Sequence, residues 1–88
     1  MSNEYHISSF VVHCLPDDIR GVRRAIGAME GSEVHACTDD GKMVVTLERD
    51  NRTDMQVAME ALATLSGVLS ASLTYHRVEA PDEPRENQ

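Results

Sequence analysis

The run Val68-Leu69-Ser70-Ala71-Ser72-Leu73-Thr74-Tyr75-His76 decides the fold, because it supplies the last strand of a symmetric pattern. Residues 5–14, 33–38 and 42–48 also read as strands. One predicted helix lies between the first two of these strands, and a second precedes the final run. The resulting order, βαββαβ, is the ferredoxin-like split βαβ arrangement, an α+β fold. We therefore expect a four-stranded antiparallel sheet with two helices on one face and the other face open.

The ends of the two predicted helices carry recognisable signals. Pro16 suits the first turn of the first helix, and Gly31 is a natural stop after it. Thr53 and Gln56 have the spacing of a capping box, so we expect Thr53 to be the N-cap of the second helix. Gly67 then stops the second helix before the final strand.

The length of the chain limits the number of domains, and its net charge limits the kinds of partner it can bind. The chain has 88 residues, enough for one small core, and its formal net charge is −7. We expect a single domain over residues 1–78 and a disordered acidic tail over residues 79–88. The acidic balance argues against nucleic acid and against an anionic membrane surface as partners, and it suits a basic partner.

The sequence shows no secretory signal and no membrane span. The first residues lack a basic region followed by an apolar one, and no window approaches the ~18 apolar residues of a span. We expect a cytoplasmic location, where Cys14 and Cys37 stay reduced and behave as small hydrophobic residues.

The alternation of side chains predicts which residues face the helices, because helices cover the more apolar face of a sheet. The residues assigned to the helix-covered face are Ser8, Phe10, Val12, Val34, Ala36, Met43, Val45, Leu47, Leu69, Ala71, Leu73 and Tyr75. The residues assigned to the opposite face are Ile7, Ser9, Val11, His13, His35, Val44, Thr46, Ser70, Ser72, Thr74 and His76. This second face mixes hydroxyls with aliphatic groups, so it is either an ordinary solvated surface or an interaction site.

Residue types that support catalysis or metal binding do not gather in the sequence. The four histidines lie on different predicted elements, without the spacing of a metal motif. Cys14 directly follows His13, but neighbours in a strand face opposite ways, so they do not form a nucleophile–base pair. Few aromatic residues are available to stack RNA bases. We therefore expect no enzyme activity, no metal site and no cofactor.

Three segments resemble the NapD family, whose members are small cytoplasmic chaperones for the catalytic subunit of periplasmic nitrate reductase. The segments are residues 7–13, residues 41–48 and, most specifically, the run Gly-Val-Leu-x-x-Ser-Leu-x-Tyr-His at 67–76. The resemblance covers about residues 5–79 and implies a binding protein. Members of the family bind the twin-arginine signal peptide of the nitrate reductase precursor, which delays export until the molybdenum cofactor is inserted and the enzyme is folded.

The resemblance also implies where the peptide binds. In the family the peptide lies as a helix on the open sheet face, which is a helix-in-groove mode of recognition. Carried onto this chain, the implied contacts are Ile7, Ser9, Val11, Val44, Thr46, Ser70, Ser72, Thr74 and His76. The candidate acids for the peptide's arginines are Glu33, Glu48 and Asp50.

One alternative function stays open at this point. The same element order occurs in ACT-like regulatory modules, which bind small ligands such as amino acids near the loop after the first strand. In this chain that loop has no glycine-rich ligand cradle. The sequence also leaves open whether the protein is a monomer or a weak dimer.

Overall fold

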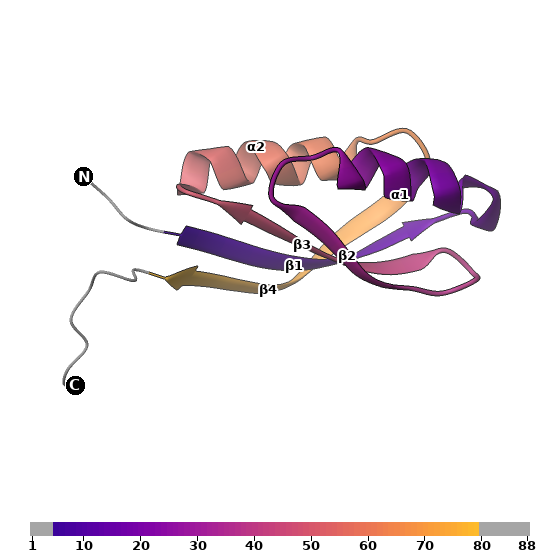
Figure 1. The fold of residues 1–88 in the computed structure, drawn as a ribbon, viewed down its shortest axis with the longest axis horizontal. Helices are drawn as coiled ribbons and strands as arrows, with labels where there is room; N and C mark the ends of the chain where they lie inside the picture. Colours follow the sequence, from indigo (N-terminus) through magenta and orange to yellow (C-terminus); the bar gives the residue numbers. More distant parts are fainter. Residues whose placement is uncertain (1–4, 80–88) are drawn as a thin grey trace.

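The computed structural model describes residues 5–79 and has the expected order of elements. The elements are β1 (Tyr5–Cys14), a 3₁₀ turn η1 (Pro16–Asp18), α1 (Ile19–Gly27), β2 (Ser32–Cys37), β3 (Lys42–Arg49), α2 (Arg52–Ala63) and β4 (Val68–Glu79). The sheet order is β2-β3-β1-β4, and all three strand pairs are antiparallel. Both helices lie on the same side of the sheet (Figure 1), so the predicted fold is confirmed.

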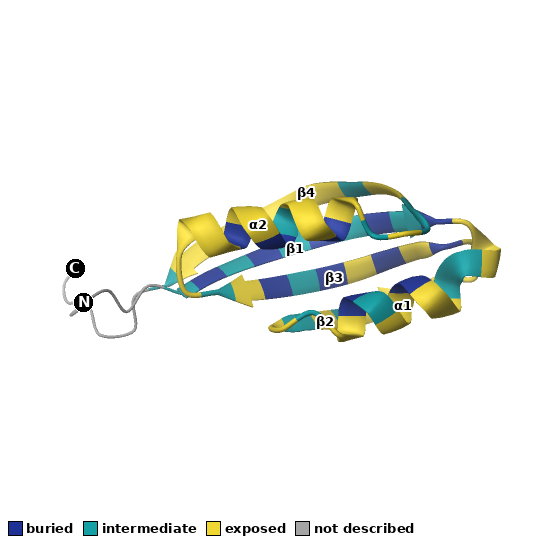
Figure 2. Ribbon diagram, turned by 90° about the horizontal axis from the view of Figure 1, so that it is seen from above, coloured by how far each residue is buried: buried dark blue, intermediate teal, exposed yellow. Residues whose placement is uncertain are grey.

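The core lies between the helices and one face of the two central strands. Every second residue of β1 is buried, and Met43, Val45 and Leu47 of β3 repeat that alternation (Figure 2). Val22 and Ile26 of α1 pack on these strands, as do three residues of α2. Those three are Met55, Ala58 and Leu62. β4 is mostly exposed, because it forms one edge of the sheet. Burial of this apolar layer is the main favourable term in folding.

The helices begin and end at residues other than those that the sequence signals predict. Asn51, not Thr53, is the N-cap of α2, and its Oδ1 accepts a hydrogen bond from the Asp54 amide at 2.8 Å. Asn51 has an extended backbone that aims its side chain at the first turn, and this capping leaves Thr53 inside the helix. α1 ends at Gly27, and Gly31 instead forms the turn into β2 with a φ of 74°.

A β-bulge in β4 reverses the predicted faces of Tyr75 and His76. Phe10 pairs with Leu73, whereas the preceding residue of β1, Ser9, pairs with Tyr75. Thr74 is therefore the extra residue, and its hydroxyl donates a hydrogen bond to the Ser9 carbonyl at 3.1 Å. After this bulge, Tyr75 points to the uncovered face and His76 to the helix-covered face. The predictions for both residues were wrong, because one inserted residue shifts the two-residue alternation.

On the helix-covered side, His76 joins β4 to β1. Its Nδ1 lies 2.7 Å from the hydroxyl oxygen of Ser8, which is fully buried. Its ring also lies beside that of His6, with 5.5 Å between the ring centroids. This polar contact gives a buried hydroxyl its partner, as a packed interior requires.

A second irregularity in β4 leaves Leu69 as an extra residue, because His13 pairs with Ser70 and Cys14 with Val68. Val68 takes the inward position and Leu69 is 65% exposed, so the prediction that Leu69 lies on the helix-covered face was wrong.

A third irregularity lies in β2. Val34 pairs with Val45, and Ala36 with Val44, so His35 is the extra residue. Ala36 therefore lies on the uncovered face, although the alternation predicted it on the helix-covered face. Cys37 takes the inward position beside the core.

β4 extends one residue past the expected domain boundary between residues 78 and 79. β4 runs through Glu79, which is the first residue of the expected acidic tail. The rest of that tail, residues 80–88, lies outside the described residues.

The β2–β3 turn provides a stability test. Gly41 has a φ of 99°, its carbonyl accepts a hydrogen bond from the Cys14 amide at 2.9 Å, and an added Cβ would collide with the Cys14 carbonyl oxygen. Gly41→Ala should lower the free energy of unfolding by about 2 kcal/mol or more, as for strain at a positive φ. Gly21→Ala, in open space on α1, should instead raise it by about 0.5–1 kcal/mol. Urea denaturation measures both, and equal midpoints for the two variants would contradict this account.

The bulge provides a second test, through deletion of single residues. Without Thr74, β4 can pair regularly with β1 while Leu73, Tyr75 and His76 keep their observed faces. The deletion should cost only the bond to Ser9, about 1 kcal/mol, and leave the His6–His76 ring contact detectable by NMR.

Deletion of Ser72 is the matched control. Ser72 lies in the regular stretch before the bulge, between two inward-facing residues. Its loss should cost more than the loss of Thr74, because Leu73 would then pair with Val11 on the open face and Thr74 with Phe10 on the helix-covered face. If the Thr74 deletion is as damaging as the Ser72 deletion, the bulge is not a removable insertion.

Candidate binding face

The uncovered side of the sheet, called the open face below, is the candidate functional surface. No helix of the described residues lies on it (Figure 1). Strand register assigns to the open face Tyr5, Ile7, Ser9, Val11 and His13 of β1, Glu33, His35 and Ala36 of β2, Lys42, Val44, Thr46 and Glu48 of β3, and Ser70, Ser72, Tyr75, Arg77 and Glu79 of β4.

The middle of the open face is lined by short side chains, apart from the exposed ring of Tyr75. Val11 of β1 lies opposite Val44 on one side and Ser72 on the other, and Ser9 lies between Thr46 and Tyr75. The open-face residues of β1 are half-buried by these neighbours, whereas Val44 is 38% exposed. The apolar residues here, called the apolar track below, are Ile7, Val11 and Val44; Ser9 lies between Ile7 and Val11, and further hydroxyls border the track. A helix can approach such a surface closely.

Two histidines on the open face have hydroxyl partners. His35 Nε2 lies 2.8 Å from the Thr46 hydroxyl, and His13 Nδ1 lies 3.3 Å from the Ser70 hydroxyl. These pairs tie neighbouring strands together. Among residues 5–79, no three or more His, Cys, Asp or Glu side chains converge in a way that could hold a metal ion.

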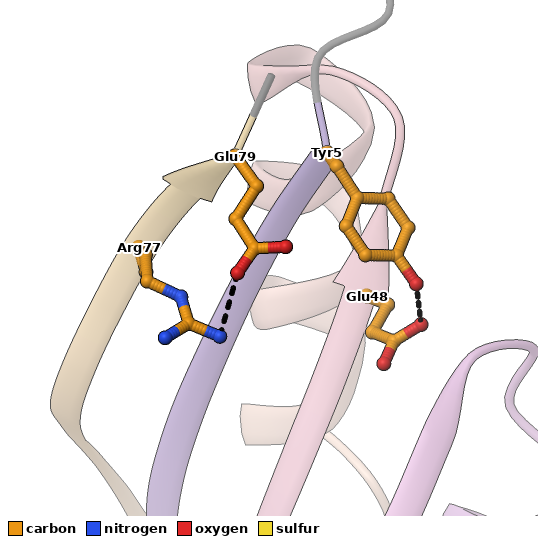
Figure 3. A network of polar contacts seen from close by, with 4 residues as sticks. All are labelled: Tyr5, Glu48, Arg77 and Glu79. Atoms are coloured by element: carbon orange, nitrogen blue, oxygen red, sulfur yellow. Dashed lines mark hydrogen bonds and ion pairs between the residues drawn. The ribbon is translucent and has the colours of Figure 1, made fainter. Parts of the chain in front are cut away.

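One end of the open face carries carboxylates. The Tyr5 hydroxyl donates a hydrogen bond to Glu48 Oε1 at 2.6 Å, and Arg77 forms an ion pair with Glu79 at 2.8 Å (Figure 3). The hydrogen bond to Glu48, together with the charges of Glu48, Glu79 and Asp50, raises the pKa of Tyr5. The phenol therefore remains a protonated donor at neutral pH.

Two of the three predicted acids, Glu48 and Asp50, lie near this end, and all three are exposed. Glu48 is opposite Ile7, and Glu33 is opposite Thr46. Asp50 directly follows β3. An arginine at this end would meet Glu48 and Asp50, whereas Glu33 lies beside the middle of the open face.

The structure gathers most of the predicted contact residues on one surface, although it does not test their role in binding. Those on the open face are Ile7, Ser9, Val11, Val44, Thr46, Ser70 and Ser72. Thr74 lies in the bulge, with its hydroxyl bound to the Ser9 carbonyl. His76 is a correction, because it lies on the helix-covered side and lines a small groove beside α2 with Met55, Met59 and Leu73. The sequence reasoning missed Tyr75 and Arg77, because no local pattern marks the bulge that turns them outward.

Neither cysteine reaches the open face. Cys14 faces the core, where burial raises the pKa of its thiol and keeps it protonated. Cys37 also faces inward. In the described part of the chain, no helix has the length and hydropathy needed to cross a membrane.

Comparisons with known proteins agree with this arrangement. The family model described as "NapD protein" matches residues 5–80. The chain is 32% identical over 78 residues to a chaperone NapD of Paracoccus pantotrophus, covering 89% of this chain and 69% of that protein. It is 28% identical over 85 residues to the chaperone NapD of Escherichia coli K12, covering 94% of this chain and 97% of that protein.

A solved structure shows the same fold. The solution structure of the E. coli Tat proofreading chaperone protein NapD aligns with a TM-score of 0.79 and 25% sequence identity, covering 100% of this chain and 96% of that one. The helix-covered sheet, the bare opposite face and the match over residues 5–80 lead to one conclusion: this chain belongs to the NapD family of chaperones.

Proposed function

We propose that the open face binds the twin-arginine signal peptide of the periplasmic nitrate reductase precursor in the cytoplasm. Binding delays export until the molybdenum cofactor is inserted and the enzyme is folded. Membership of the NapD family supports this role, as does structural similarity to the E. coli protein, which is a Tat proofreading chaperone. The role requires a binding protein with no catalytic step.

The observation that carries the proposal is the pairing of an apolar track with carboxylates at one end of the open face. A signal peptide has a positively charged region followed by an apolar segment. Ile7, Val11 and Val44 suit the apolar segment, and Glu48 with its neighbouring acids suits the arginines. The same surface therefore complements both parts of one peptide.

The dimensions are consistent with a helical guest. From Ile7 to His13 the strand advances six residues, about 20 Å at ~3.3 Å per residue. A helix of roughly 13 residues has the same length at ~1.5 Å per residue. Hydroxyls of Ser9, Ser72 and Thr46 leave room for its side chains, as a helix lying in a shallow groove requires.

Replacement of Val44 by lysine tests the surface. A charged side chain on the apolar track should weaken binding of the synthetic signal peptide at least tenfold, because the apolar segment loses its contact and the arginines are repelled. The affinity is measured by fluorescence anisotropy of a labelled peptide. Val57→Lys is the matched control, because Val57 is exposed on α2 on the opposite side of the sheet.

Two further measurements distinguish damage to the binding surface from unfolding of the protein. Ser72→Arg on the adjacent strand should also abolish binding, and the circular dichroism melting curve of each variant reports folding. If Val44→Lys and Ser72→Arg both remain folded and bind as tightly as the unmodified protein, the open face is not the binding surface.

A further inference from the structure

We infer that the free edge of β4 pairs with β4 of a second copy of this chain, antiparallel and about a two-fold axis at Ala71. The two four-stranded sheets then join into one. This inference goes beyond the proposed function, because it concerns the edge of the sheet and not the open face. It rests on the backbone of β4, on its exposed apolar side chains and on the order of residues in one short segment.

The hydrogen bonds of β1 show which of its residues turn their backbone groups toward β4. The Cys14 amide donates a hydrogen bond to the Gly41 carbonyl at 2.9 Å, which continues the register of β1 with β3. In an antiparallel pair, residues that exchange hydrogen bonds alternate with residues that do not. Val11 and His13 therefore turn their N–H and C=O groups toward β4.

The same alternation places backbone groups of β4 on the outer edge. Ser72 and Ser70 are the partners of Val11 and His13, so their N–H and C=O groups are used within the sheet. The N–H and C=O groups of Ala71 and Leu73 consequently point away from the sheet. They are available to a further strand.

β4 also carries much of the exposed apolar surface. Figure 2 shows this edge strand as mostly exposed. Four of the seven large apolar residues that are exposed in the described part of the chain belong to it: Leu69, Leu73, Tyr75 and Val78. The other edge strand, β2, is six residues long against twelve in β4, and it carries the charged Glu33. A long apolar edge favours pairing with another strand.

The order of residues in β4 selects a second copy as the occupant. Residues 69–73 read Leu-Ser-Ala-Ser-Leu in both directions. Antiparallel pairing about Ala71 therefore places each Leu69 opposite a Leu73 and each Ser70 opposite a Ser72. In a two-fold interface the same patch serves both copies, and this segment is complementary to itself.

Charge favours the same contact. Each copy has a formal net charge of −7, so two copies repel each other over most of their surfaces. Residues 61–76 contain no Asp, Glu, Lys or Arg. Arg77 and Glu79, which form an ion pair with each other, lie beyond the palindromic segment. The edge around Ala71 is thus a place where two acidic copies can meet without bringing like charges together.

The length of the paired segment predicts a weak dimer. With Ala71 opposite Ala71, Val68 lies opposite Thr74, and Tyr75 would lie opposite Gly67, which precedes β4. The pairing therefore spans Val68 to Thr74. A stable interface uses about 20–30 residues from each partner, so this shorter one should form at high protein concentration.

The joined sheet would keep both helix layers on one side. Residues that lie directly opposite each other in an antiparallel pair have their side chains on the same face. The open faces of the two copies would therefore lie side by side and form one continuous surface.

Sedimentation equilibrium of the unmodified protein tests the association. The apparent mass should rise toward twice the monomer mass between about 20 µM and about 1 mM protein, as for a small interface. Sodium chloride should strengthen the association, because it screens the repulsion between two acidic copies. A protein that stays monomeric over this whole range would overturn the inference.

An NOE between the methyl groups of Leu69 and Leu73 tests the register. Within one strand these residues are four positions apart, about 13 Å at ~3.3 Å per residue, which is too far for an NOE. In the inferred dimer they lie opposite each other. The NOE should therefore be present in a concentrated sample and fade on dilution. A dimer without this NOE would show that the two copies pair elsewhere.

Leu69→Lys and Val57→Lys form a matched pair of variants. The two side chains are 65% and 63% exposed, and both substitutions change the net charge equally, but Val57 lies on α2. Leu69→Lys should lower the association constant at least tenfold, whereas Val57→Lys should change it less than twofold. Leu69 lies outside the core, so both variants should keep the circular dichroism melting curve of the unmodified protein. Equal effects of the two substitutions on association would contradict pairing at β4.

Addition of the synthetic signal peptide separates this inference from the proposed function. The peptide should shift open-face signals whether or not the protein dimerises. If the amide signals of Ala71 and Leu73 are independent of protein concentration and shift only when the peptide is added, the peptide and not a second copy occupies the edge.

Discussion

The side chains of β1 alternate between the buried core and the open face, and the rest of the structure depends on this alternation. β1 pairs with β3 on one side and β4 on the other, so its side chains set the register of the whole sheet. Phe10, Val12 and Cys14 are buried under the helices, while Ile7, Ser9 and Val11 remain half-exposed. Because both helices are used to cover one face, the chain seals its core and leaves a second layer of side chains available for a partner.

The bulge at Thr74 combines two functions in one edge strand. Before the bulge, β4 presents Ser70 and Ser72 to the open face. After it, Tyr75 and Arg77 reach that face, and His76 turns inward to the hydroxyl of Ser8. The same irregularity therefore anchors β4 to β1 and extends the open face toward the carboxylates. Bulges often re-aim side chains in this way beside functional sites.

Charge and shape on the open face act together. Hydroxyls and valines let a guest approach closely, and the carboxylates near Tyr5 give one end a different character from the other. Isolated exposed charges contribute little affinity, so in the proposed function they would mainly steer a basic partner to the surface. This combination is consistent with a chaperone that recognises a short segment of its client.

Local patterns were sufficient to predict the order of elements, the bounds of β1 and the inward positions of Met43, Val45 and Leu47. These features depend on alternation and turn residues that lie close together in the chain. The resemblance of residues 67–76 added the family, which the comparisons confirm. It also added the prediction that the open face binds the partner, which stays a prediction. The faces of Ala36, Tyr75 and His76 could not be predicted, because each lies next to or beyond a bulge. A bulge forms where hydrogen bonds to a distant strand accommodate one extra residue, as the bond from Thr74 to Ser9 does. The sequence of one strand does not specify how that strand pairs with its partner, so it does not reveal the bulge.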